Sequence, residues 1–135
     1  MNQRATAKVL CYYLGLTLLL VHEMDAVHHR EWRLLYGLRS LSDTAAYPTF
    51  LWLHVPLYVL VLWLSHLERV GIQTATRTLV SAFLVIHAGI HSYVAGTPGY
   101  SFDTLSNLFL YGAAVMGLLY LILREPERNS AGEAP

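Results

Sequence analysis

The side chains best suited to chemistry begin with a cluster at the end of the first apolar run. Residues 22–29 (HEMDAVHH) contain three histidines, one glutamate and one aspartate. On a helix that turns about 100° per residue, His22, Asp25 and His29 share one narrow face, whereas Glu23 and His28 point elsewhere. Ionisable groups at membrane depth are costly and need partners, so we interpret this cluster as part of a site.

Three more histidines lie inside later apolar runs. His87 and His91 are spaced i, i+4, which places both imidazoles on one helix face, within reach of one metal ion. His54 lies beside Pro56, and a proline inside a helix frees a backbone carbonyl and kinks the helix. Imidazole and carboxylate groups are suitable ligands for Zn, Fe, Mn or Ni. The predicted ligands of a divalent metal ion, Zn or Fe, are His22, Asp25, His54, His87 and His91.

The composition indicates which elements must position these residues. The chain has 135 residues, enough for one domain, and is 55% hydrophobic but only 13% charged. Soluble domains carry about 25% charged residues, so this composition is typical of an integral membrane protein. Four segments approach or reach the roughly 20 apolar residues that a membrane-spanning helix needs. The prediction is an all-α, four-helix transmembrane bundle: one domain over 1–123, with spans at 7–27, 48–67, 78–95 and 104–123, followed by a disordered cytoplasmic tail at 124–135.

The same composition excludes several classes of protein. A single cysteine, Cys11, excludes an internal disulfide and a thiolate metal cage, and a net charge of zero gives no reason to expect nucleic acid binding. Lysine and arginine are more frequent in the tails and the loop on the side that holds both termini than in the loops on the other side. We therefore expect a multi-pass protein of the inner cell membrane with both ends cytoplasmic. The expected partners are the lipid bilayer and a lipid-borne substrate, and the oligomeric state is left open.

Alternating spans would bring the polar residues to one depth. The end of the first span, the start of the second, the end of the third and the start of the fourth all lie at the outer side. The fourth begins with Asp103, Ser106 and Asn107, and Asp103 is placed to cap it. We therefore predict one polar centre in the outer half of the bundle.

Features outside this centre predict how the helices pack and end. Ala113 and Gly117 form a small-xxx-small face, and Gly89 is expected to allow a second helix to approach closely. Residues 28–38 are expected to continue the first helix as an amphipathic stretch at the membrane surface, with Trp32 and Tyr36 in the aromatic belt.

Several functions fit a histidine and aspartate centre. A metal ion would acidify a bound water for attack on an ester or amide, or supply redox chemistry if it were iron. The zinc-hydrolase motif His-Glu-x-x-His is absent, because position 26 is Ala. The alternatives are a b-type haem held between His54 and His87 or His91, a proton relay without metal, and a structural or interaction subunit with no chemistry. Whether the protein is an enzyme is left open, and no catalytic residue is assigned.

The order of these residues resembles a known family. The pattern is His22-x-x-Asp25, Glu31-Trp32, His54, His87-x-x-x-His91 and a polar start to the fourth span. It is similar to a family of small four-span bacterial membrane proteins without assigned function, a resemblance that implies no activity. There is also a broad likeness to membrane hydrolases that use His, Asp and Ser around zinc. That likeness would give Ser106 a role, although those enzymes have more spans.

Overall fold

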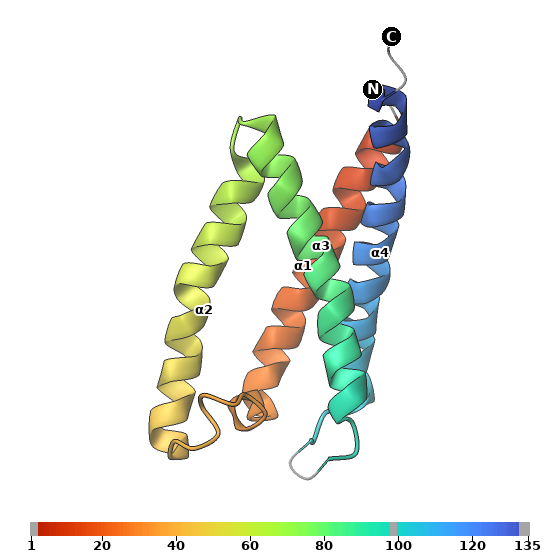
Figure 1. Cartoon of the computed structure of the whole chain (residues 1–135). Helices are drawn as coiled ribbons and strands as arrows, with labels where there is room; N and C mark the ends of the chain where they lie inside the picture. The colour runs from red at the N-terminus through yellow and green to blue at the C-terminus, as the bar shows by residue number, and fades with distance from the viewer. Residues whose placement is uncertain (1–2, 98–99, 133–135) are drawn as a thin grey trace.

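The chain is all helical in the part that the structure describes. The structure is a computed structural model, which describes residues 3–97 and 100–132, with side chains as far as Arg124. Its elements are α1 (Gln3–His28), the 3-10 helix η1 (Glu31–Arg33), α2 (Asp43–His66), α3 (Val70–Val94) and α4 (Thr104–Gly132) (Figure 1). No strand occurs among these residues, which confirms the predicted all-α class.

Three of the four long helices are long and apolar enough to cross a membrane: α1, α2 and the Thr104–Arg124 part of α4. The length and composition of these three helices are those of membrane-spanning segments. α3 is as long as the others, but it carries Arg77, His87 and His91 within its apolar run, and these residues lower its hydropathy. α4 continues to Gly132, beyond the expected end at 123. Helix α4 therefore covers residues 124–132 of the expected tail, residues 133–135 lie outside the described part, and disorder of the tail stays a prediction.

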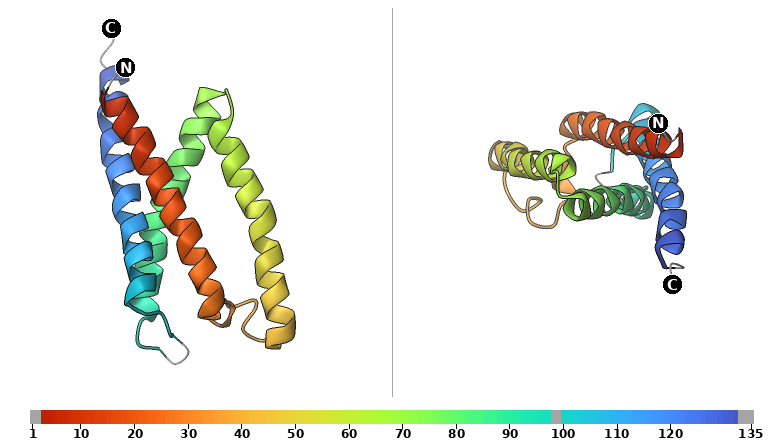
Figure 2. Two further views of the ribbon diagram at one scale, coloured as in Figure 1. Left: turned by 180° about the vertical axis from the view of Figure 1, so that it is seen from behind. Right: turned by 90° about the horizontal axis from the view of Figure 1, so that it is seen from above.

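Three helices form a packed group, and α2 stands partly apart from it. α1 and α3 both pack along α4, whereas α2 contacts α3 near the turn that joins them and diverges from it toward the other end (Figures 1 and 2). Most of α2 is exposed, including Trp52 and Trp63, as expected for a surface that faces lipid.

Small residues allow the close packing of α1, α3 and α4. A Cβ atom at Gly117 would lie 2.6 Å from the backbone oxygen of Ser81, and one at Gly15 would lie 2.8 Å from a methyl group of Leu84. Ala113 is buried in the same interface. The predicted packing face at Ala113 and Gly117 is thus confirmed. The prediction for Gly89 is wrong, since a Cβ there would meet nothing within 4 Å.

Polar contacts hold α2 to the group at the end where the described chain begins. The hydroxyls of Tyr12 and Ser65 are 2.5 Å apart, and Tyr13 hydrogen-bonds to His66 at 2.8 Å. Arg77 of α3 donates to the Ser65 carbonyl at 2.9 Å. α2 is therefore fixed near the turn at residues 67–69, and it can diverge only toward the opposite end.

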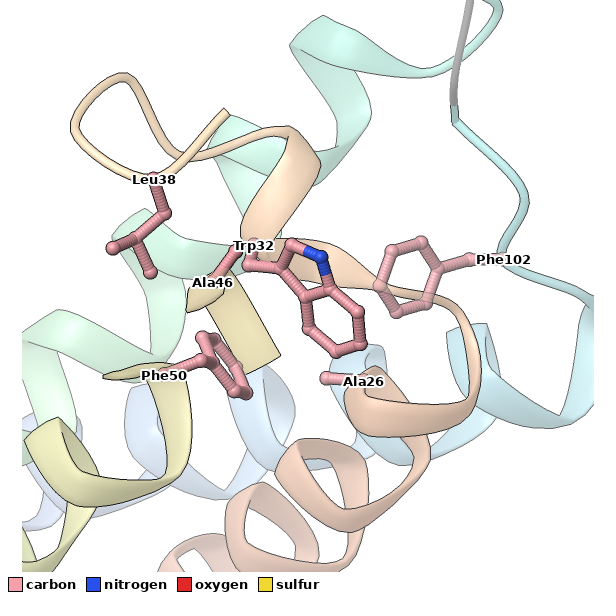
Figure 3. Close-up of a cluster of buried hydrophobic side chains, with 6 residues drawn as sticks. All are labelled: Ala26, Trp32, Leu38, Ala46, Phe50 and Phe102. Carbon is pink, nitrogen blue, oxygen red and sulfur yellow. The ribbon is translucent and has the colours of Figure 1, made fainter. Parts of the chain in front are cut away.

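At that opposite end, a tight loop replaces the predicted extension of the first helix. α1 ends at His28, and Arg30 adopts the left-handed backbone conformation, with φ of 55°. Trp32 then turns inward and lies between Phe50 and Phe102 in a buried cluster (Figure 3). Its indole N–H donates to Asp43 at 3.1 Å, and Arg33 also donates to this carboxylate, which raises the pKa of Arg33. These contacts fix the position of Glu31 beside the ends of α1 and α3.

Candidate metal centre

Three histidines meet where α1 and α3 end. One nitrogen each from His22, His87 and His91 lie within 4.8 Å of one another. His22 is fully buried and His91 is 2% exposed. The ring centroids are 4.7–5.5 Å apart, with each pair arranged edge to face. Three nitrogens grouped in this way could hold one metal ion.

Each of the three rings has a buried nitrogen that lacks a hydrogen bond. Both nitrogens of His22, Nε2 of His87 and Nδ1 of His91 are buried without a hydrogen-bond partner among the described groups. A buried polar group left unsatisfied costs about 1–3 kcal/mol. A cation bound by the three rings would satisfy three of these groups at once.

Glu31 sets the orientation of His91. Its Oε1 lies 3.3 Å from His91 Nε2, and its side chain is almost completely buried. Because a carboxylate accepts, Nε2 carries the proton and Nδ1 keeps its lone pair, without a hydrogen-bond partner among the described groups. Burial raises the pKa of the Glu31 carboxyl, but the hydrogen bond from His91 and the nearby histidines outweigh burial, so the net pKa falls below its usual value. A carboxylate behind a histidine ligand is a common arrangement in metal sites.

Glu23 connects a third helix to the cluster. Its Oε2 lies 3.2 Å from His54 Nε2, and its Oε1 lies 3.7 Å from His87 Nε2. His54 Nδ1 must donate to the Phe50 carbonyl, 2.7 Å away, so the contact between Nε2 and Glu23 needs a second proton. Glu23 and His54 therefore share one proton, either as an ion pair or as a neutral pair. With both nitrogens engaged, His54 has none left for a metal or a haem iron.

Asp25 belongs to a separate group of side chains. It lies with His29 and Asp103, receives a hydrogen bond from the Ser106 hydroxyl, and is 3.4 Å from His29 Nε2. Phe102 lies between the two groups, with its ring centroid 5.5 Å from that of His22 and 4.9 Å from that of His29. The structure thus brings together three of the five predicted ligands and places Asp25 and His54 in other contacts.

Asp103 holds the first turn of α4. Its carboxylate accepts hydrogen bonds from the backbone N–H groups of Leu105 and Ser106, each at 2.9 Å, and the Ser106 bond is the main reason that the pKa of Asp103 is lowered. The predicted helix cap is confirmed.

Spacing alone does not single out Glu23, because it lies off the face that His22, Asp25 and His29 share. Three helices surround the end of α1, and a different residue of α1 contacts each of them. His22 meets α3, Asp25 meets Ser106 of α4, and Glu23 meets His54 of α2. Adjacent residues differ by about 100° around a helix, so Glu23 can reach a helix that His22 does not. The available signal was a histidine near the same end of the second and third predicted spans and a serine near that end of the fourth.

The cluster opens on a cavity of about 340 Å³ between α1, α2, α3 and η1. Glu23, Glu31, His54, His87 and His91 line its polar part, and apolar side chains line the remainder. A small molecule in this cavity would contact both the imidazoles and the proton shared by Glu23 and His54.

Comparison with known proteins identifies a family but no activity. No curated protein and no solved structure matches the chain. The sequence matches a family of unknown function, DUF6713, over residues 8–126, which include all the polar residues described above. The chain therefore belongs to this family of unknown function, DUF6713.

Proposed function

We propose that this protein is a membrane metalloenzyme, in which His22, His87 and His91 hold one divalent metal ion, Zn or Fe. The observation that carries the proposal is the convergence of their nitrogens within 4.8 Å, with a free nitrogen on every ring. Glu31 supports the assignment, because its contact with His91 leaves the Nδ1 lone pair of that ring free to bind. Three protein ligands would leave an open position for water or substrate, as in catalytic zinc sites.

The reaction proposed is hydrolysis of an ester or amide in a lipid-borne substrate. A cation held by these histidines would polarise the carbonyl and lower the pKa of a bound water. Glu23 and His54 already share a proton near His87, so they can take a proton from the attacking water and return it to the leaving group. The water oxygen forms the new bond to carbon, the bond to the leaving oxygen or nitrogen breaks, and no electrons are exchanged. This proton pair is why we favour hydrolysis over redox chemistry.

We place the site in the outer half of the inner cell membrane, with four helices spanning the bilayer and both ends cytoplasmic. The 25 residues of α3 give a length of roughly 37 Å at 1.5 Å per residue, enough to cross a hydrocarbon core of about 30 Å. α3 also packs along α4, which is itself apolar enough to span. The described chain starts and ends on the side opposite the site (Figure 1).

Metal analysis of the purified protein tests the proposal directly. We expect one metal ion per chain in the native protein and a loss of nearly all of it in a His87→Ala, His91→Ala variant. His66→Ala is the matched control, because His66 is an exposed histidine at the other end of α2 and should not affect metal content. Far-ultraviolet circular dichroism checks that all variants keep their helices. Equal metal content in the native protein and the double variant would refute the site.

A second candidate function is a proton relay without metal, which the Glu23 contacts to His54 and His87 favour. A proton-flux measurement distinguishes the relay from the metalloenzyme. It uses metal-free protein in vesicles that contain a pH-sensitive dye. Proton flux that persists without metal and stops in Glu23→Gln would favour the relay, whereas absence of flux would favour the metalloenzyme.

A further inference from the structure

We propose that the substrate is a single-chain lipid whose acyl tail lies in a groove between α1, α2 and α3, with its ester or amide group at the histidines. This inference deepens the proposed function and rests on it for the position of the polar group. Its basis is a second cavity of about 280 Å³, next to the polar one. The lining of this second cavity includes Leu16, Leu19, Leu57, Val61, Val80 and Phe83.

The two cavities form one amphiphilic space. Leu19, Leu57, Tyr58 and Phe83 line both of them. The second cavity is lined by hydrocarbon and aromatic side chains, with the Tyr58 hydroxyl as the only polar side-chain group among its described residues. The joined space is therefore apolar at one end and carries carboxylates and imidazoles at the other. A molecule with a hydrocarbon tail and a polar group matches this division.

The length of the groove fits an alkyl chain. Leu79 lines the far end and precedes His87 by eight residues of α3, which correspond to roughly 12 Å along the helix. An extended alkyl chain of medium length covers this distance. A helix from another protein does not fit, because a 10 Å wide helix of that length occupies roughly 900 Å³. That volume is well above the 280 Å³ and 340 Å³ of the two cavities.

The groups at the polar end can bind an uncharged head group. Glu23 and Glu31 both face the polar cavity, and the pair of Glu23 and His54 holds one shared proton. That pair is neutral overall, so Glu31 supplies the net negative charge of these side chains, and it would repel a phosphate or a free fatty acid when no cation is bound. An ester, amide or hydroxyl group can bind a cation through its oxygen without added negative charge. The substrate class that fits is thus a monoacyl ester or amide with a neutral head group.

Photocrosslinking in phosphatidylcholine nanodiscs tests the groove. The probe is a monoacylglycerol with a diazirine in the middle of its chain, and mass spectrometry locates the labelled peptides. We expect labelling of the α2 and α3 segments that contain Val61 and Val80, with strong competition by excess unlabelled monoacylglycerol. Leu57→Trp should lower the competed labelling at least tenfold, because the indole fills the junction of the two cavities.

Leu60→Trp is the matched control. Leu57 and Leu60 are both about half exposed on α2, but Leu60 lines neither cavity, so its substitution should leave labelling unchanged. Labelling that is not competed, or that Leu57→Trp and Leu60→Trp affect equally, would overturn the proposal. Metal content is measured in the same samples and should not change in either variant. Absence of metal from the native protein would refute the proposed function, whereas competed labelling would still support the groove.

Discussion

Replacing Glu31 by glutamine tests whether the buried carboxylate positions a metal ligand. Glutamine keeps the size of the side chain and can still accept a hydrogen bond from His91 Nε2 through its amide oxygen. It lacks the negative charge that strengthens this bond and makes the His91 lone pair more basic. We therefore expect Glu31→Gln to fold normally but to bind zinc more weakly.

The expected magnitude follows from the geometry. Glu31 is 5% exposed, so solvent screens its charge little, and its Oε1 lies 3.3 Å from the ligand ring. Loss of a carboxylate behind a metal ligand typically reduces metal affinity about 10- to 100-fold. At about 1.4 kcal/mol per factor of ten, this range corresponds to roughly 1.4–2.8 kcal/mol of binding free energy.

Competition between the protein and a fluorescent zinc chelator measures this change. Glu68→Gln is the matched control, because Glu68 is an exposed glutamate in the turn between α2 and α3, far from the centre. Thermal unfolding of the metal-free proteins shows whether a loss of stability contributes. An unchanged zinc affinity in Glu31→Gln would show that the carboxylate does not act through His91, and our assignment of its role would be wrong.

Two further predictions concern stability. Gly117→Ala should destabilise the bundle by about 1–3 kcal/mol, because the added Cβ would lie 2.6 Å from the Ser81 backbone oxygen. Gly89→Ala, whose Cβ meets nothing within 4 Å, should not destabilise it, and denaturation in mixed micelles compares the two variants. Acid should also destabilise the metal-free protein through Glu31. Its folded pKa lies below the reference value of 4.5, so the unfolded state binds more protons, and its stabilising effect is present above pH 4.5 and lost as the pH falls through the folded pKa. Unfolding midpoints between about pH 6 and 3 should fall less steeply in Glu31→Gln than in the native protein, and parallel curves would contradict this account.

The buried cluster around Trp32 connects the fold to the site. Trp32 follows Glu31 directly in the chain, packs between Phe50 of α2 and Phe102, and bonds to Asp43. These contacts keep Glu31 pointed toward His91 although it comes from a short loop. The position of Glu31 at the candidate centre thus depends on the packing of Trp32 outside it. This packing allows a carboxylate that does not belong to a long helix to take part in the centre.

The amino-acid sequence by itself determined the helical class and which ends of the helices carry polar groups. Long apolar runs specify helices because lipid and burial both require internal backbone hydrogen bonds. The i, i+4 spacing of His87 and His91 likewise fixes their common face, and Asp103 caps α4 through contacts within its own turn. These are local properties, so they can be read from spacing alone.

Only the tertiary structure decided which polar residues meet. Helical periodicity fixes the angle between His22, Glu23 and Asp25, but it does not say which neighbouring helix lies in each direction. The packing of α1 against α4, and the divergence of α2, direct Glu23 to His54, Asp25 to Ser106 and His22 to the histidines of α3. The left-handed backbone at Arg30 ends the first helix and brings in Glu31. These outcomes depend on contacts between distant parts of the chain, so the spacing of residues along it could not reveal them.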